Sequence, residues 1–454
     1  MTAPDATSPA ATSTPATSWR DSLAVYLQPR VLIVLFLGFS SGLPLALSGS
    51  TLLVWMREAG VDLKTIGLFA LVGTPYTLKF LWAPLVDALH VPLFTRAFGR
   101  RRGWLLFSQL LLIVAILLLA MTDPGRSPFY VALGALLVAT TSSTQDIVVD
   151  AFRVESLPES EQAAGMAAYV AAYRIGMLVS TAGALFIVSG FESTGITRTS
   201  AWMWGYVVMA AMVLIGTITA LAATEPEQSV RAEAATHEET AFTRVLHAAI
   251  GAFSEFLSRK DAIAALAFVV LFKFTDAFSG TMTAPFVIDL GFTRNDYAAI
   301  VKGVGLAATL IGGFAGGFVA RRYSLANSLW IGGVVQALAN LTFSWLALVG
   351  TNQWALALAI CAENFTSAVG TVIFVAYLSA LCQNPLHTAT QYALLTALAA
   401  VGRTYLSSGA GFVANTTGWP LFFVICVLVA IPSLVLLTWL QRRGHFESLG
   451  PVRI

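Results

Sequence analysis

Two carboxylates lie near the end of an apolar segment, in the stretch ATTSSTQDIVVDAFRVE from Ala139 to Glu155. Asp146 and Asp150 are four residues apart, so on a helix they share one face. In a membrane helix each ionised acid would cost on the order of 3 kcal/mol unless it faced a polar cavity or a partner. A carboxylate in such a place can take up and release a proton. In a soluble protein the same pattern would be an ordinary amphipathic helix, so composition must decide between the two readings.

The composition is that of an integral membrane protein. Of 454 residues, 57% are hydrophobic and only 11% charged, and the mean hydropathy is +0.76. An ordinary soluble domain carries roughly 25% charged residues. The net charge of +2 gives no basic field for nucleic acid. Three cysteines without CxxC spacing do not predict a disulfide or a metal site.

Apolar segments long enough to cross a bilayer, which takes about 20 residues, fall into two groups of six. We therefore predict an all-α membrane protein with about 12 transmembrane helices in two pseudo-symmetric six-helix bundles. The spans are expected near 30–56, 65–89, 104–122, 128–151, 162–190, 201–222, 261–288, 297–320, 325–349, 353–382, 388–415 and 419–441.

The predicted division is a disordered tail over 1–29, an N-terminal bundle over 30–223, a polar linker over 224–260, a C-terminal bundle over 261–441 and a short tail over 442–454. Arginine and lysine gather in the segments on one side, whereas the loops on the other side hold only Arg57, Lys64, Arg126, Arg198 and Arg294. The positive-inside rule then places both termini and the linker in the cytoplasm.

Several motifs of the N-terminal half resemble the AmpG muropeptide permeases, which belong to the major facilitator superfamily. They include LGFSSGLPLALSGSTL from Leu37 to Leu52, GRRRGWLL from Gly99 to Leu106, STQDIVVDAFRVE from Ser143 to Glu155 and AAYRIGMLVSTAGAL from Ala171 to Leu185. The C-terminal half matches less distinctively. The resemblance implies import of anhydromuropeptides, N-acetylglucosamine–anhydro-N-acetylmuramyl peptides, across the bacterial inner membrane for peptidoglycan recycling. It also implies proton symport and a link to β-lactamase induction and β-lactam resistance.

Charged residues inside the spans mark a solute pathway by default. We predict that Lys79, Arg174, Lys302 and Arg403 make the cavity cationic and attract the carboxylates of a stem peptide. Glu363, Lys273 and Asp276 are further candidates for substrate contact, together with Gln145 and the aromatic residues Tyr76 and Tyr173. Two alternatives stay open: charges of neighbouring helices can simply pair, and Lys273 and Asp276, three apart, can neutralise each other.

Asp146 is the predicted carrier of the coupled proton, and Asp150 is expected to tune or gate it. The alternative is that both acids only pin their helix to Arg153 and the Arg100–Arg102 run. Asp87, Arg100, Arg101, Arg102 and Arg153 are predicted to gate the cytoplasmic end, because ion pairs at helix ends can hold one conformation closed. Positive-inside anchoring explains the arginines equally well, but it does not require Asp87.

Two classes of function compete at this point. The first is a secondary transporter, expected to be a monomer, with a substrate, protons and lipids as its partners and no need of a cofactor. The second is a polytopic enzyme or receptor, for which no HExxH, GxSxG, P-loop or Cys/His cluster argues. Within the transporter class, acyl-CoA, sugars and small peptides are the alternative solutes.

Overall fold

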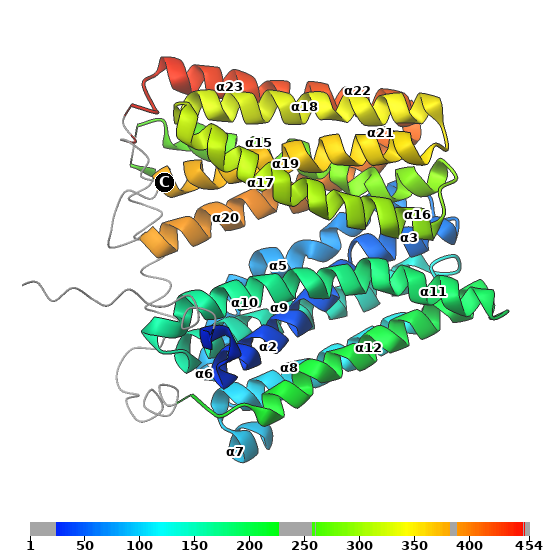
Figure 1. Cartoon of the computed structure of the whole chain (residues 1–454), viewed down its shortest axis with the longest axis vertical. Coiled ribbons are helices and arrows are strands. Elements are labelled where there is room, and N and C mark those ends of the chain that lie inside the picture. Colours follow the sequence, from blue (N-terminus) through cyan, green and yellow to red (C-terminus); the bar gives the residue numbers. More distant parts are fainter. Residues whose placement is uncertain (1–23, 227–256, 259, 382–387, 448, 450–454) are drawn as a thin grey trace, which may run out of the picture.

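The computed structural model describes residues 24–226, 257–258, 260–381, 388–447 and 449, and every element in these ranges is a helix. Helices of the first half and helices of the second half form two groups that lie side by side (Figure 1). Most of the predicted N-terminal tail and most of the predicted linker lie outside the described residues, so those two predictions stay open.

The N-terminal group contains seven helices of eight residues or more: α2 (Pro29–Leu47), α3 (Ser50–Glu58), α8 (Arg100–Ala120), α9 (Pro128–Ser156), α10 (Glu159–Leu178), α11 (Ala184–Ser193) and α12 (Arg198–Ala222). A π-helix, η4 (Val179–Gly183), joins α10 to α11. Shorter elements are η1 (Val25–Leu27), α4 (Leu63–Leu68), η2 (Phe69–Gly73), α5 (Thr74–Leu78), η3 (Lys79–Leu81), α6 (Ala83–Ala88) and α7 (Phe94–Phe98).

The described part of the C-terminal group has a corresponding set of helices: α15 (Ala262–Asp289), α17 (Gly305–Arg322), α18 (Leu325–Val349), α19 (Gln353–Leu381), α20 (Thr388–Tyr405), α21 (Ala410–Thr417), α22 (Trp419–Val429) and α23 (Ile431–Arg442). The short α16 (Arg294–Asp296) and a second π-helix, η5 (Tyr297–Val304), precede α17. A 3-10 turn, η6 (Leu406–Gly409), joins α20 to α21.

In the described part of the chain, 10 helical segments are long and apolar enough to cross a membrane. The two remaining predicted spans, 65–89 and 388–415, are instead broken into shorter pieces by 3-10 turns. In the first of these, Pro75 and Pro84 open α5 and α6, because proline lacks the N–H that would continue the preceding helix. Asp62 caps the N-terminus of α4, at the beginning of this region. The hydroxyl and the amide of Thr65 donate hydrogen bonds to the Asp62 carboxylate, and these bonds hold the pKa of that carboxyl below its usual value.

Close packing of α2 against α10 depends on glycines. A Cβ on Gly42 would lie 2.1 Å from the backbone oxygen of Tyr173, and one on Gly176 would lie 2.3 Å from that of Phe39. Lipid tails are as apolar as leucine, so helices in a bilayer associate through such close contacts rather than through burial from water. This packing fixes the α10 side chains Tyr173 and Arg174 relative to α2.

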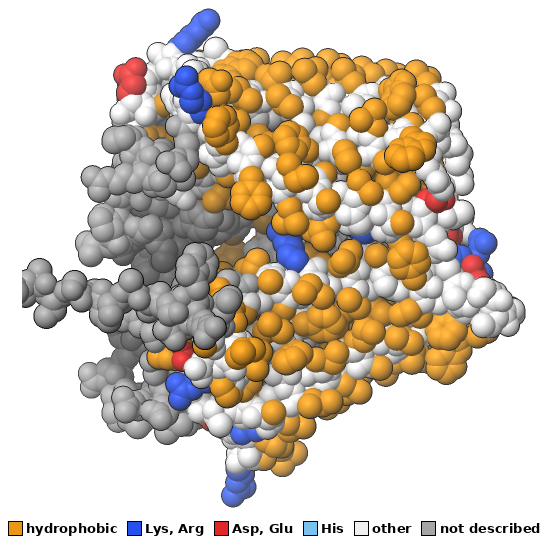
Figure 2. Space-filling model, viewed as in Figure 1, with side chains coloured by type: hydrophobic (Ala, Val, Ile, Leu, Met, Phe, Trp, Pro, Cys, Tyr) orange, Lys and Arg blue, Asp and Glu red, His pale blue; other side chains and the backbone are white. Residues whose placement is uncertain are grey.

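The contacts between the two halves include those of α3 with α15, α4 with α21, η4 with η5, and α11 with α16. A further contact joins α5 to α20, where the hydroxyls of Thr77 and Thr404 are 3.1 Å apart. Figure 2 shows many apolar side chains on the visible face of both halves, and a surface that is hollowed between the halves toward the grey segments. The halves are therefore joined mainly at the end away from those segments.

Candidate functional site

A cavity of about 290 Å³ lies between the two halves. Three residues predicted to contact substrate line it: Arg174 from α10, Lys302 from η5 and Glu363 from α19. The other lining groups include the hydroxyls of Ser50, Thr181, Thr283, Tyr297 and Thr309 and the amide of Asn364. Both π-helices contribute to this wall, and π-helical turns inside α-helices often mark functional sites.

A second cavity of about 410 Å³ adjoins the first, because Ser50, Leu53 and Gly280 line both. Tyr76 and Arg403, two further predicted contacts, line this second cavity with Phe69 and Ser48. The first cavity thus carries two cations and an acid, and the second carries one cation beside two aromatic rings. The structure brings five of the predicted residues to two adjoining cavities between the halves.

Asp146 lies in the wall of the N-terminal half, 6% exposed. Ser41, Lys79 and Asp150 are among its polar and charged neighbours. Its Oδ1 atom has no hydrogen-bond partner among the described residues. Burying a polar atom without a hydrogen-bond partner costs free energy, so packing alone does not explain a carboxylate at this position.

Four other predicted residues lie in the region around Asp146. Lys79, at the start of η3, lies within electrostatic range of both acids and is not among the residues that line the two cavities. Asp150 is 48% exposed and pairs with Arg153 at 3.8 Å. Gln145 is fully buried and donates weakly to the hydroxyls of Ser40 and Ser41, at 3.5 and 3.4 Å. Tyr173 lies beside Tyr169, with ring centroids 6.0 Å apart.

In the C-terminal half, Lys273 and Asp276 pair at 3.3 Å, as the neutralising alternative expected. The pair also joins two helices, because Lys273 donates to Thr371 at 2.8 Å and Ser367 donates to Asp276 at 2.8 Å. Glu363 is different. It accepts from the Asn364 side chain at 2.7 Å, and its nearest charged neighbours are Asp276 and Lys302.

Comparisons with known proteins identify the family of this chain. The family model described as Major Facilitator Superfamily matches residues 34–407. The anhydromuropeptide permease of Escherichia coli K12 is 39% identical over 94% of this chain and 83% of its own length. The chain belongs to the AmpG family of the Major Facilitator Superfamily. The putative transporter AmpG 4 of Rickettsia felis is 35% identical over 92% of this chain and 98% of its own length.

Solved structures support the fold of this AmpG-family chain. A mutant form of the nucleoside transporter NupG has a TM-score of 0.69 at 13% identity, covering 93% of this chain and 100% of its own. A D-xylose–proton symporter has a TM-score of 0.65 at 12% identity, covering 91% of this chain and 97% of its own. At such low identity these likenesses bear on the fold alone. The relatives named above are a permease and a transporter, so the chain is a multi-pass membrane transporter and not an enzyme.

The predicted gating residues of this AmpG-family chain pair within the N-terminal half. Arg101, 5% exposed, donates from Nε and Nη2 to Glu155 at distances down to 2.6 Å, and Arg100 lies 3.9 Å from the same acid. Glu225 accepts from the backbone amides of Arg101 and Arg102 at 2.8 and 3.0 Å. The Asp87 side chain lies outside the described part of the structure. A gating role for this set stays a prediction.

Three groups in the AmpG-family site were not predicted from the sequence. The hydroxyl of Thr309 and the amide of Asn364 face the first cavity and contact each other at 3.3 Å. Glu155 and Glu225 hold the arginine run. At the end of the molecule away from the arginine run, Arg57 and Arg294 form ion pairs that join the two halves. Short polar residues and terminal charges carry no distinctive sequence signal, and their partners lie far away along the chain.

Proposed function

We propose that this transporter imports anhydromuropeptides across the bacterial inner membrane for peptidoglycan recycling. The observation that carries the proposal is the set of cationic residues that line the space between the halves, where Arg174 and Lys302 adjoin Arg403 and the ring of Tyr76. A substrate with carboxylates on a peptide and hydroxyls on two sugar rings needs cationic groups and an aromatic or hydroxyl-rich wall. The name of the E. coli relative supports the same substrate.

The two cavities support a division of the substrate. Arg174 and Lys302 offer cationic donors in the first cavity, which suits the carboxylates of the stem peptide. Tyr76 and Phe69 offer apolar ring surface in the second cavity, which suits the face of a sugar ring. Arg403 can reach a carboxylate or a carbonyl at the junction.

Proton symport is the second part of the proposal, with Asp146 as the proton carrier and Asp150 as its modulator. Asp146 is buried in the half that also carries Arg174 and lies within electrostatic range of Lys79. Protonation would remove a buried charge and so change the relative free energies of two conformations. The expected topology places both termini in the cytoplasm. The link to β-lactamase induction would follow from the identity of the imported products.

Binding of a defined ligand series to the purified protein tests the substrate. The series contains the bare anhydro-disaccharide, the same disaccharide with a tripeptide, the free tripeptide and acetyl-CoA. We expect the disaccharide–tripeptide to bind most tightly, since in this series it alone offers both stem-peptide carboxylates to the cations of the first cavity and sugar rings to the aromatic wall of the second. Tighter binding of acetyl-CoA or of the free tripeptide would contradict the proposal and point to another solute.

A further inference from the structure

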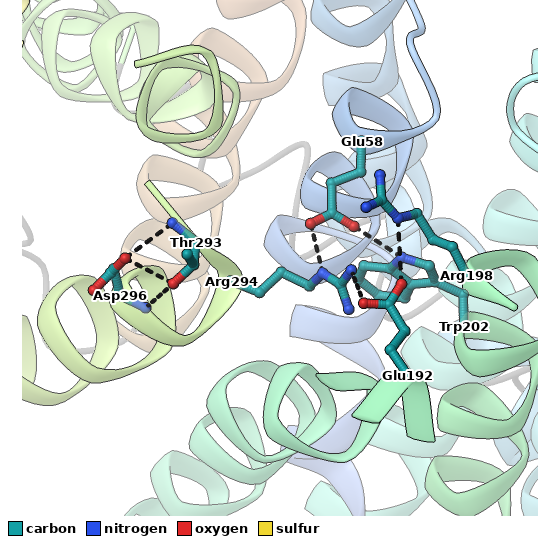
Figure 3. Close-up of polar contacts among 7 residues, drawn as sticks. All are labelled: Glu58, Glu192, Arg198, Trp202, Thr293, Arg294 and Asp296. Atoms are coloured by element: carbon teal, nitrogen blue, oxygen red, sulfur yellow. Dashed lines mark hydrogen bonds and ion pairs between the residues drawn. The ribbon is translucent and has the colours of Figure 1, made fainter. Parts of the chain in front are cut away.

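One arginine joins the two halves at the end of the molecule that the charge distribution predicts to face outward. Arg294 begins α16 in the C-terminal half, and its side chain is only 6% exposed. Its Nε donates to Glu58 at 2.5 Å and its Nη2 donates to Glu192 at 2.7 Å. Both acids belong to the N-terminal half, at the ends of α3 and α11 (Figure 3).

The two acids each have a second partner in their own half. The indole Nε1 of Trp202 donates to Glu58 at 3.0 Å, and Nε of Arg198 donates to Glu192 at 3.2 Å. Trp202 and Arg198 both lie on α12. If the halves separated at this end, Glu58 and Glu192 would each keep one hydrogen bond.

Arg294 has no comparable replacement in the described part of its own half. Asp296, two residues away, accepts from the amide and hydroxyl of Thr293 at 3.0 and 2.7 Å and from Gln353 at 2.6 Å. Figure 3 shows Asp296 and Thr293 together on one side, with Arg294 directed away from them toward the two acids. The Nη1 atom of Arg294 already lacks a partner among the described residues, although the guanidinium lies 5.6 Å from the Trp202 ring.

In a second ion pair at this end, both residues also have a hydrogen-bond partner in their own half. Arg57 of the N-terminal half pairs with Asp289 of the C-terminal half. Arg57 also donates to the Val61 carbonyl at 2.9 Å, and Trp419 also donates to Asp289 at 3.1 Å. Each member of this pair would therefore keep a partner after separation, so the cost of opening falls mainly on Arg294.

We propose that Arg294 is the latch that holds the outer end of this transporter closed, through Glu58 and Glu192. The free energy needed to open the outward path is then set by removing one buried guanidinium from two carboxylates, which is costly because a buried charge loses its compensation. The inference goes beyond the proposed function and rests on it only for the assignment of the outer side. It is independent of which solute is carried.

Accessibility of the cavity from outside tests the latch. Ser50 lines both cavities and lies eight residues before Glu58 on α3, about 12 Å along the helix axis. A Ser50→Cys variant, with the three native cysteines replaced by serine, is labelled in intact cells with a membrane-impermeant maleimide. Arg294→Gln is compared with Arg198→Gln, a matched control that removes another arginine from the same Glu192 but leaves the contact between halves.

We expect Arg294→Gln to speed labelling from outside by about tenfold or more, because the lost buried pair shifts the equilibrium toward the outward-open state. Arg198→Gln should label at the parent rate or more slowly. Equal rates for Arg294→Gln and the parent, or equal increases in both variants, would overturn the latch. Rapid outside labelling of the parent itself would overturn it too, because the closed end would then face inward. If Arg294→Gln does not fold, the Glu58→Gln/Glu192→Gln variant is held to the same outcomes.

A failure of the latch and a failure of the proposed function are distinguishable, since the labelling experiment contains no muropeptide. If the purified protein binds the disaccharide–tripeptide and Arg294→Gln has no effect on labelling, the proposed substrate stands and the proposed latch is wrong. The reverse result would retain the latch in a transporter of another solute.

Discussion

Some charged side chains inside this protein are held by a partner, and others face the space between the halves. Lys273 and Asp276 satisfy each other and two hydroxyls, which makes them a link between α15 and α19. Arg174 and Arg403 instead line cavities, and neither has a carboxylate within ion-pair distance among the described residues. A guanidinium that faces a cavity is available to a ligand.

Substitution of these arginines by lysine separates ligand binding from packing. A guanidinium can hold a carboxylate through two parallel hydrogen bonds, whereas an ammonium is a single point charge. We expect Arg174→Lys or Arg403→Lys to weaken binding of the disaccharide–tripeptide by about tenfold, the equivalent of one charge-assisted hydrogen bond. Binding of the bare disaccharide should change little. Isothermal titration of both ligands measures the difference, and equal losses for both would show that the arginines are structural.

At the scale of elements, the sequence predicts the long helices closely. The expected span 325–349 coincides with α18, and the expected 353–382 and 419–441 differ by one residue at one end from the observed segments. Continuous apolar runs between charged or glycine-rich turns determine these ends. The prediction is less accurate where a run contains its own breaks. Predicted span 65–89 becomes five short elements, and 388–415 becomes three.

The site was predicted in composition but not in arrangement. Charges inside apolar segments identify Arg174, Lys302, Glu363 and Arg403, because a charge in a span requires a reason. Apolar segments do not reveal that Lys79 is a charged neighbour of Asp146 or that Lys302 lines the cavity. These positions depend on how segments of different helices pack. The Arg294 latch escaped notice because loop charges outside the spans are ordinary, and Glu58 is 236 residues away.

The contact between α4 and α21 yields a prediction at this scale. A Cβ on Gly411 would lie 1.9 Å from the Leu63 carbonyl oxygen, across the junction of the halves, whereas a Cβ on Gly409 would meet nothing within 4 Å. Gly411→Ala should therefore force α21 away from α4 at a cost of about 1–3 kcal/mol, the usual range for overpacking. Gly409→Ala is the matched control.

The midpoint of thermal unfolding is measured for both variants in detergent. Unfolding is followed with a dye that becomes fluorescent when it reacts with cysteine thiols that unfolding exposes. The midpoint for Gly411→Ala should fall by several degrees while that for Gly409→Ala stays close to wild type. Equal midpoints for the two variants would show that the halves do not touch at this position.

At the scale of the whole molecule, the structure is closed at one end and hollowed at the other. Ion pairs of Arg57 and Arg294 cross between the halves at the closed end. The arginine run at the opposite end pairs with Glu155 and Glu225 inside one half. If the predicted topology holds, the hollowed end faces the cytoplasm, as in the inward-open state of a transporter. The proposed import would then require the outer end to open, and a change of charge at a buried acid can bias such a step.

The most direct test of this account is accumulation of labelled disaccharide–tripeptide in proteoliposomes under an imposed proton gradient. Wild-type protein should concentrate the ligand above its outside level, and a protonophore should abolish the excess. Asp146→Asn keeps the shape of the side chain but cannot titrate, so it should lose accumulation while it retains exchange at equal pH. Asp123→Asn, in the loop between α8 and α9, should behave as wild type. Full gradient-driven accumulation by Asp146→Asn would contradict the assignment of the proton, and no uptake by wild type would contradict the transport of muropeptides itself.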